Sequence, residues 1–294
     1  MNQKPNNDAP CDSSQRFLFE EADIRGEHIT LSTALNAVYG EHAYSVSVRE
    51  LLGQFAAAAV LISNNLKYHG KIVLQARSQS ALSLIMIECT SDSQIRGIAR
   101  GDIETIVEDP IALIAEGQLA ITIERDGGQR YQGIVDLQAA TLAAALDNYF
   151  LQSEQLNTHF WLAADGDAAA GLMLQQLPAQ QQQSAEDREA QWQDALILAN
   201  TVTPEELLML PATVLLHRLY HEHPLRLFET AAVVFHCSCS RERSLNALTC
   251  LPPSELNELF AEQGDVELGC EMCGKSYRFT AKDLTGLAEP PVLH

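Results

Sequence analysis

The C-terminal part of the chain carries two close cysteine pairs, Cys237-Ser238-Cys239 and Cys270-Glu271-Met272-Cys273, and Gly274 follows the second pair. Thirty residues separate Cys239 from Cys270. Two pairs of thiolates brought together by a folded insert supply the four ligands of a tetrahedral ion. A glycine directly after the second pair permits the tight backbone turn of a metal-binding knuckle. The sequence therefore predicts one zinc ion per chain, bound by these four cysteines in the reduced protein.

The residues around the cysteines predict a small folded module. A strand is expected over Ala232–Phe235, and a helix capped by Ser254 is expected to run through Ala261, with Gly264 as its C-cap. Val266–Leu268 and Lys275–Thr280 predict a hairpin with the second cysteine pair at its tip. About sixty residues with few large apolar side chains need a further source of stability, and zinc binding supplies on the order of 10 kcal/mol.

The spacing of the cysteines leaves two roles for the site open. Structural zinc ribbons more often use two C-x-x-C knuckles, whereas here one pair is C-x-C. Zinc-bound thiolates still react with oxidants, and disulfide formation would remove all four ligands together with the folding energy of the module. The chemistry of these residues does not decide between a redox switch and a permanent structural site.

The other cysteines and one nearby histidine are expected to lie outside the site. Cys11 belongs to a polar N-terminal stretch, and Cys89 ends a predicted strand, where a buried small hydrophobic role is expected. Cys250 and His236 are interpreted as bystanders, because either would spoil a symmetric site of two plus two ligands.

Composition and charge narrow the class of protein. The 294 residues carry a formal net charge of −20, and 46% of them are hydrophobic. An acidic chain is a poor partner for nucleic acid, whose phosphates require clustered Lys and Arg. The polar N-terminus is no signal peptide, and the apolar stretch Leu51–Ser63 is too short to span a bilayer. We expect a soluble cytoplasmic protein that binds neither nucleic acid nor membrane. Seven cysteines in such a chain indicate metal or redox chemistry.

Four segments are predicted along the chain: a disordered lead over 1–15, an α+β domain over 16–178, a helical linker over 179–230 and a C-terminal zinc-binding domain over 231–294, in which a redox switch remains one of the two open roles. The α+β domain is expected to contain a largely antiparallel sheet with helices. Its predicted strands are Phe17–Phe19, Lys71–Arg77, Ala81–Glu88, Gln94–Arg100, Leu119–Arg125, Gln129–Leu137 and His159–Ala164. Its predicted helices are Val46–Leu66, Thr141–Gln152 and Ala168–Leu177.

The predicted linker begins with a glutamine run over Gln180–Gln183 and a charged stretch. Thr203-Pro204-Glu205-Glu206 is typical of a helix start with a capping box, and Pro211 separates two helices. The segment is too small to be stable alone. Its three histidines, His217, His221 and His223, offer two possible ligands on one helical face, but no third is placed, so surface or partly buried positions are predicted.

No catalytic constellation stands out in the sequence. It contains no P-loop, no G-x-S-x-G, no H-E-x-x-H and no dinucleotide-binding fingerprint. Outside the cysteine pairs, the sequence therefore offers no candidate catalytic site.

The chain resembles the 33 kDa redox-regulated heat-shock chaperone family (heat-shock protein 33). The C-x-C-S-x-E-R string from Cys237 to Arg243 and the Cys270–Gly274 knuckle match its C-terminal signature. Further landmarks lie along the rest of the chain: Arg25-Gly26-Glu27, Leu66-Lys67, Tyr131–Val135, Tyr149-Phe150, Ser153-Glu154-Gln155 and Gln176-Leu177-Pro178.

The resemblance implies an ATP-independent holdase, not an enzyme, that keeps unfolding client proteins from aggregating under oxidative stress. It implies that the reduced, zinc-bound monomer is inactive, and that oxidation pairs Cys237 with Cys239 and Cys270 with Cys273. Zinc then leaves, the linker is destabilised, apolar surface becomes available and the chain dimerises. Two alternatives remain: a thiol–disulfide oxidoreductase using Cys270 and Cys273, and a constitutive zinc-ribbon adaptor.

Overall fold

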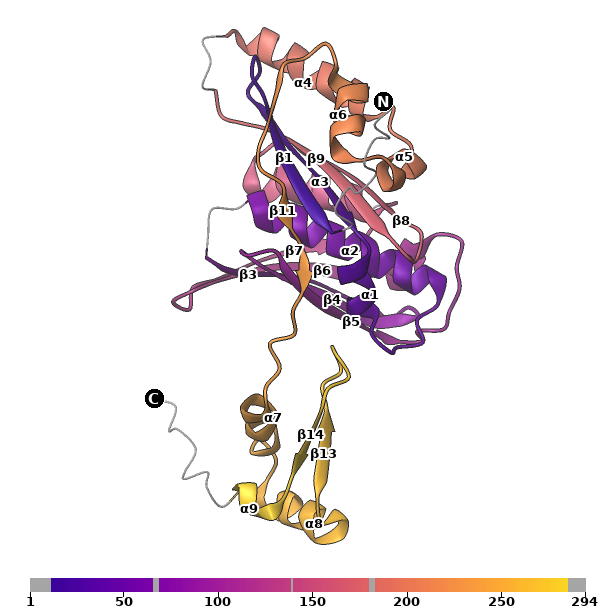
Figure 1. Cartoon of the computed structure of the whole chain (residues 1–294), viewed down its shortest axis with the longest axis vertical. Helices are drawn as coiled ribbons and strands as arrows, with labels where there is room; N and C mark the ends of the chain where they lie inside the picture. Colours follow the sequence, from indigo (N-terminus) through magenta and orange to yellow (C-terminus); the bar gives the residue numbers. More distant parts are fainter. Residues whose placement is uncertain (1–11, 66–68, 139, 180–182, 285–294) are drawn as a thin grey trace, which may run out of the picture. The chain divides into compact units, whose positions relative to one another are not determined.

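Helix α2 (Val46–Asn65) forms the centre of the larger part of the molecule. Its residues from Val48 to Ser63 are almost all buried, including the run of alanines Ala56–Ala59. A helix that is apolar all round must be covered on every side, and α2 packs between two six-stranded sheets, as Figure 1 shows. By length and composition α2 could cross a membrane, but it is mostly buried inside the protein.

The computed structural model describes residues 12–65, 69–138, 140–179 and 183–284. The chain divides into two compact units, Met1–His236 and Cys237–His294. The boundaries predicted within the first unit, between α+β domain and linker, stay predictions.

The first sheet has the strand order β10-β1-β2-β9-β8, with β11 also paired to β1, and all of its pairs are antiparallel. Its strands are β1 (Ser13–Phe19), β2 (Ile24–Leu31), β8 (Thr158–Ala164), β9 (Ala169–Gln176), β10 (Leu225–Leu227) and β11 (Ala231–Ala232). One face of this sheet packs on α2 and the other is covered by the helices described below.

The second sheet has the order β12-β5-β4-β3-β6-β7 and is antiparallel except for the β12–β5 pair. Its strands are β3 (Gly70–Arg77), β4 (Leu82–Thr90), β5 (Gln94–Gly101), β6 (Gln118–Arg125), β7 (Arg130–Asp136) and β12 (Val234–Phe235). Alternate residues of β3, β4 and β6 point into the main core, where α1 (Thr33–Tyr39) and α3 (Leu142–Tyr149) also pack.

A layer of three helices covers the outer face of the first sheet: α4 (Ala185–Ala199), α5 (Pro204–Met209) and α6 (Ala212–Tyr220). We call Ala185–Tyr220 the helical layer. Its core brings Trp192 and Tyr220 against Phe17 and Phe19 of β1, with the Tyr220 and Phe19 rings 4.9 Å apart. The helical layer is therefore held mainly by apolar contact with a single sheet face.

The second unit contains α7 (Arg241–Leu248), α8 (Pro253–Gln263), the hairpin β13 (Val266–Gly269) and β14 (Ser276–Phe279), and α9 (Ala281–Leu284). Its core has five buried side chains in the described residues: Leu248, Phe260, Val266, Tyr277 and Phe279. So few buried apolar groups supply little hydrophobic stabilisation for a folded unit.

The predicted α+β class with largely antiparallel sheets is confirmed, but several local predictions were wrong. Ala168–Leu177 was predicted to be a helix, yet Ala169–Gln176 is strand β9. Met173 faces the main core while Leu172 and Leu174 face the helical layer. A strand buried on both faces reads as a continuous apolar run, which periodicity cannot distinguish from a helix.

Other differences concern the ends of elements. The predicted lead extends too far, because β1 begins at Ser13, where polar residues pair with β2 and β11. Helix α8 has Pro252 as its N-cap rather than Ser254, since Pro253 already occupies its first turn. Strand β2 and helices α1 and α7 were not predicted. The rest of the lead with Cys11, residue Leu66 and most of the glutamine run lie outside the described residues.

Candidate metal centre

The four cysteines of the two pairs come together in the second unit. Cys237 and Cys239 lie between β12 and α7, and Cys270 and Cys273 form the turn between β13 and β14. Their sulfur atoms all lie within 4.8 Å of one another. Two separations across the pairs are 3.7 Å for Cys237 Sγ to Cys270 Sγ and 3.5 Å for Cys239 Sγ to Cys273 Sγ.

These distances fit a tetrahedral metal site. Ligand sulfurs about 2.3 Å from a central zinc ion lie about 3.8 Å from each other. The two measured separations are close to that value and well above the roughly 2.05 Å of a disulfide bond. The donor set is four sulfurs, which suits a soft or borderline metal. The four cysteines can therefore hold a metal ion.

Backbone hydrogen bonds shape the second half of the centre. The amides of Cys273 and Gly274 both donate to the Cys270 carbonyl, and the Cys270 amide donates to the Lys275 carbonyl. Gly274 has a φ of 70°, in the left-handed region that side chains with a Cβ adopt only at a cost. The hairpin tip predicted from the sequence is confirmed, and its turn directs both sulfurs to the same side.

The first half of the centre is fixed by the start of α7. Ser240 caps the helix by accepting a hydrogen bond from the Arg243 amide. The Arg243 side chain donates to both the carbonyl and the hydroxyl of Ser238, the residue between the two cysteines. The chain from Cys237 to Cys239 is thereby tied to a helix end rather than left as a free loop.

Arg241 connects the start of α7 to β14. Its guanidinium donates to the Arg278 carbonyl, pairs with Asp283 Oδ1 at 2.7 Å and lies 4.5 Å from the centre of the Phe279 ring. Since Phe279 is fully buried in the small core, Arg241 joins the two halves of the centre through the surrounding fold.

The environments of the sulfurs differ. Burial raises the pKa of the Cys237 thiol, and it raises the pKa of Cys273 to about 12. Burial acts in the same direction on Cys239, but hydrogen bonds from the Tyr277 hydroxyl, 3.2 Å away, and from the other thiols outweigh it and lower the Cys239 pKa to about 7. The bond to Cys239 in turn raises the pKa of Tyr277 to about 12. Cys239 is therefore the sulfur that ionises first among these three.

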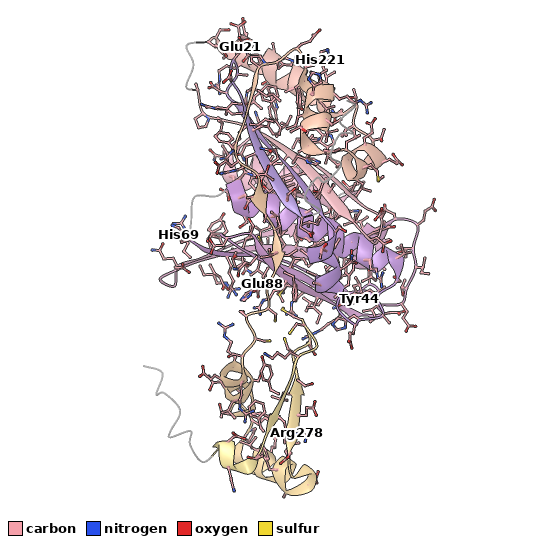
Figure 2. The ribbon with its side chains drawn as sticks, viewed as in Figure 1. Glu21, Tyr44, His69, Glu88, His221 and Arg278 are labelled. Carbon is pink, nitrogen blue, oxygen red and sulfur yellow. The ribbon has the colours of Figure 1, made fainter. Side chains whose placement is uncertain are left out.

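Cys89, Cys250, His236 and the three histidines near α6 lie outside the four-cysteine cluster. Cys89 is fully buried in the main core, whereas Cys250 is exposed on the second unit. Among the described residues, these four cysteines are the one group of three or more possible metal ligands that lie close together, and His236 does not belong to it. His217 and His221 are exposed on and just after α6 (His221 is labelled in Figure 2), and His223 is half-buried.

The sequence did not single out Tyr277, Arg241 or Arg243 as parts of the centre. Tyr277 lies within the predicted hairpin, but its contact with Cys239 depends on how α7 packs against β14. The helix that positions both arginines follows the C-x-C pair directly, and Ser240 was an available N-cap signal. The Cys270–Cys273 pair does not begin a helix, unlike the usual catalytic C-x-x-C of thiol oxidoreductases.

Comparisons with known proteins agree along nearly the whole chain. A family model described as Hsp33 protein matches residues 12–280. A 33 kDa chaperonin of Pseudomonas aeruginosa (strain LESB58) is 49% identical over 279 residues, covering 94% of each chain. The 33 kDa chaperonin of Ectopseudomonas mendocina (strain ymp) is 50% identical, covering 94% of this chain and 95% of the relative.

The fold agrees as well. The crystal structure of a 33 kDa chaperonin from Thermotoga maritima superposes with a TM-score of 0.80 at 20% identity, covering 94% of this chain and 97% of the other. The curated relatives are named chaperonins, a family without enzymatic activity. The chain belongs to the Hsp33 family of chaperones.

Proposed function

We propose that the protein is a redox-regulated, ATP-independent holdase of the cytoplasm, which binds unfolding proteins and prevents their aggregation under oxidative stress. The observation that carries the proposal is the four-sulfur cluster within a unit that has only five buried core side chains in its described residues. The fold of such a unit depends on its metal ligands, so a reaction that modifies the sulfurs also destabilises the folded unit.

Zinc is the proposed metal, one ion per reduced chain, held by Cys237, Cys239, Cys270 and Cys273. Zinc bound to four thiolates supplies folding free energy and takes no part in electron transfer itself. The Tyr277 hydroxyl supports ionisation of Cys239, and Gly274 and the Arg243–Ser238 contact hold the two pairs in place. In this state the chaperone is inactive and monomeric.

Oxidation by a peroxide would proceed with four thiolates giving up four electrons to two peroxide molecules. Two S–S bonds form and two O–O bonds break, and the four peroxide oxygens leave as hydroxide, which the buffer protonates to water. No thiolate ligand then remains for the metal. Hypochlorite would accept electrons in the same way.

We propose that the disulfides join Cys237 to Cys239 and Cys270 to Cys273. Disulfides within each pair suit a switch better than disulfides across the centre. A bond from Cys237 to Cys270 would close a loop of more than thirty residues and stabilise the folded unit by about 3–4 kcal/mol. Local bonds leave the two halves free to separate, which is what a switch requires.

Unfolding of the second unit would then act on residues 225–236, which precede Cys237, and on the helical layer. The helical layer rests on one sheet face through a core that includes Trp192, Leu215 and Tyr220. Its release would expose that apolar sheet face and the apolar sides of the helices to clients. The net charge of −20 would keep complexes with clients in solution, and the oxidised chain is proposed to form homodimers.

The experiment compares two forms of the full chain in an aggregation assay with a thermally unfolded client. The zinc-loaded reduced protein should leave light scattering unchanged, and protein oxidised with peroxide at raised temperature should suppress it at near-equimolar ratio. Zinc release, followed with a chromophoric chelator, should precede suppression. Equal suppression by both forms would reject the switch, and zinc that resists oxidation would favour a constitutive ribbon adaptor.

Two variants sharpen this experiment. Cys270→Ser removes one proposed ligand and should make the chain active without oxidant, because the centre cannot form. Cys250→Ser changes an exposed thiol outside the cluster and should behave as wild type. Reduction of insulin disulfides that disappears in Cys270→Ser would instead support a thiol–disulfide oxidoreductase.

A further inference from the structure

His28 is a buried imidazole that the proposed redox switch does not use. It lies on β2 with 2% of its surface exposed, between Gln15 of β1 and Leu172 of β9 in the register of the first sheet. Its side chain is on the face that the helical layer covers, where the backbone of Leu207 in α5 is close enough to the ring to partly offset the effect of burial on its pKa. His28 is therefore a polar contact between the sheet and the helical layer.

One ring nitrogen of His28 has no partner. Nε2 is buried without a hydrogen bond to any described residue. In the neutral tautomer with hydrogen on Nδ1, Nε2 is an acceptor and carries no proton. This arrangement suits an uncharged ring, because a second N–H would be left buried with nothing to accept it.

The surroundings offer no counter-charge for a protonated ring. Beside His28 lies a cavity of about 320 Å³ between β2 and the α5–α6 connection, and its other lining residues, from Ser13 to Thr230, carry no ionisable side chain. The sheet neighbours Gln15 and Leu172 are uncharged.

The charged groups of the covering helices either pair with residues other than His28 or are exposed to solvent. On α5, Glu206 pairs with Arg218 of α6 and caps Thr203, and Glu205 is exposed. His217 of α6 is exposed, as is Glu229, next to the cavity-lining Thr230. No carboxylate among the described residues approaches the His28 ring within hydrogen-bonding distance.

We propose that His28 makes docking of the helical layer sensitive to acid, as a trigger that needs neither oxidant nor loss of metal. A proton on Nε2 places an unpaired charge under α5, and the ring, of which 2% is exposed, becomes fully solvated when α5 lifts from the sheet. Helix α5 has six residues and one buried side chain, Leu207, so it is the part of the layer that opens most readily. Opening of α5 would expose apolar surface. An effect of acid on client binding rests on the proposed holdase function.

The direction and size of the effect follow from linkage. Burial lowers the pKa of His28 to about 4 in the docked state, whereas a solvated histidine titrates near 6.5. Docking is therefore fully stable above pH 6.5 and weakens as the pH falls toward 4. The equilibrium for opening shifts about tenfold at pH 5.5 and about thirtyfold at pH 5.

Beyond the end of the helical layer, His223 lies 3.1 Å from Asp194 of α4. The Asp194 carboxylate therefore faces His223 and is not a partner of His28.

The test is hydrogen exchange of the amides of residues 204–216 in the reduced, zinc-loaded full chain at pH 7.5 and 5.5, corrected for intrinsic exchange rates. Wild type should open about tenfold more at pH 5.5. His28→Leu, which fills the same space without a titrating group, should show no such change, and His28→Gln serves if the leucine variant does not fold. His217→Gln, at an exposed site, should respond like wild type.

An equal acid response in wild type and in the folded His28 variants would overturn the proposal. The same samples, mixed with a client at pH 5.5, separate the two proposals. If opening depends on His28 but no client binds, the acid-sensitive contact stands and the holdase function fails.

Discussion

Replacing Gly274 by alanine tests whether backbone strain in the turn after Cys273 lowers the affinity of the centre for its metal. Gly274 has a φ of 70°, and a Cβ added there would meet no atom within 4 Å. The cost is therefore conformational rather than steric, about 1–2 kcal/mol for a residue with a Cβ in the left-handed region. Because folding of the second unit is coupled to metal binding, this strain should appear as weaker binding.

Gly269 provides a matched control on the other side of the same cysteine pair. A Cβ there also meets nothing within 4 Å, but its φ is not in the left-handed region. Gly269→Ala should leave affinity unchanged or slightly raised, since alanine restricts the unfolded chain. Gly274→Ala should lower zinc affinity about five- to thirtyfold. Gly274→Asn should lie between, because asparagine tolerates this conformation better than alanine.

The measurement is a competition between the reduced, metal-loaded full chain and a chromophoric chelator of known affinity, under anaerobic conditions. Circular dichroism of the loaded variants checks that each has folded. Equal affinities for Gly274→Ala and Gly269→Ala would refute the argument, because the two variants differ only in the backbone conformation that each alanine must adopt.

Three further predictions concern neighbours of the centre. Arg241→Ala removes a carbonyl hydrogen bond and a cation–π contact and should speed zinc removal by a chelator roughly tenfold, whereas Arg278→Ala loses only an exposed ion pair and should not. Tyr277→Phe removes the hydroxyl that hydrogen-bonds Cys239 and should weaken zinc binding by the reduced chain about fivefold, as chelator competition can measure. Cys250→Ser should retain one zinc per chain by metal analysis.

The cluster itself could be predicted because cysteine spacing carries its own geometry. A C-x-C and a C-x-x-C-G each present two sulfurs from one short turn, so only the folding of the insert had to be assumed. The hairpin could also be predicted, because Tyr277 and Phe279 alternate with polar residues, and on β14 these two side chains are buried while their neighbours are exposed. Residues close together in the sequence were thus sufficient to predict the metal ligands.

What could not be predicted depends on contacts between distant segments. The hydrogen bond from Tyr277 to Cys239 and the reach of Arg241 to Asp283 require the packing of α7 on the hairpin. Strand β9 was mistaken for a helix because its second covered face is provided by helices later in the chain. His28 looked like one more polar residue of a strand, and nothing local indicates that α5 covers it.

Residues 225–236, which join the helical layer to the cysteine centre, are held by very short ladders. Strand β10 contributes three residues and β11 two to the edge of the first sheet, while β12 adds two to the edge of the second. The last bond before the centre runs from the His236 amide to the Ile95 carbonyl, one residue from Cys237. Short ladders open at low free energy. If the proposed switch operates, loss of the fold beyond Cys237 removes the anchor at one end of this segment, and opening can proceed backward through β12 and β11 to the helical layer. Acid acting at His28 would start from the other end, which is why the two triggers can be separated by mutation.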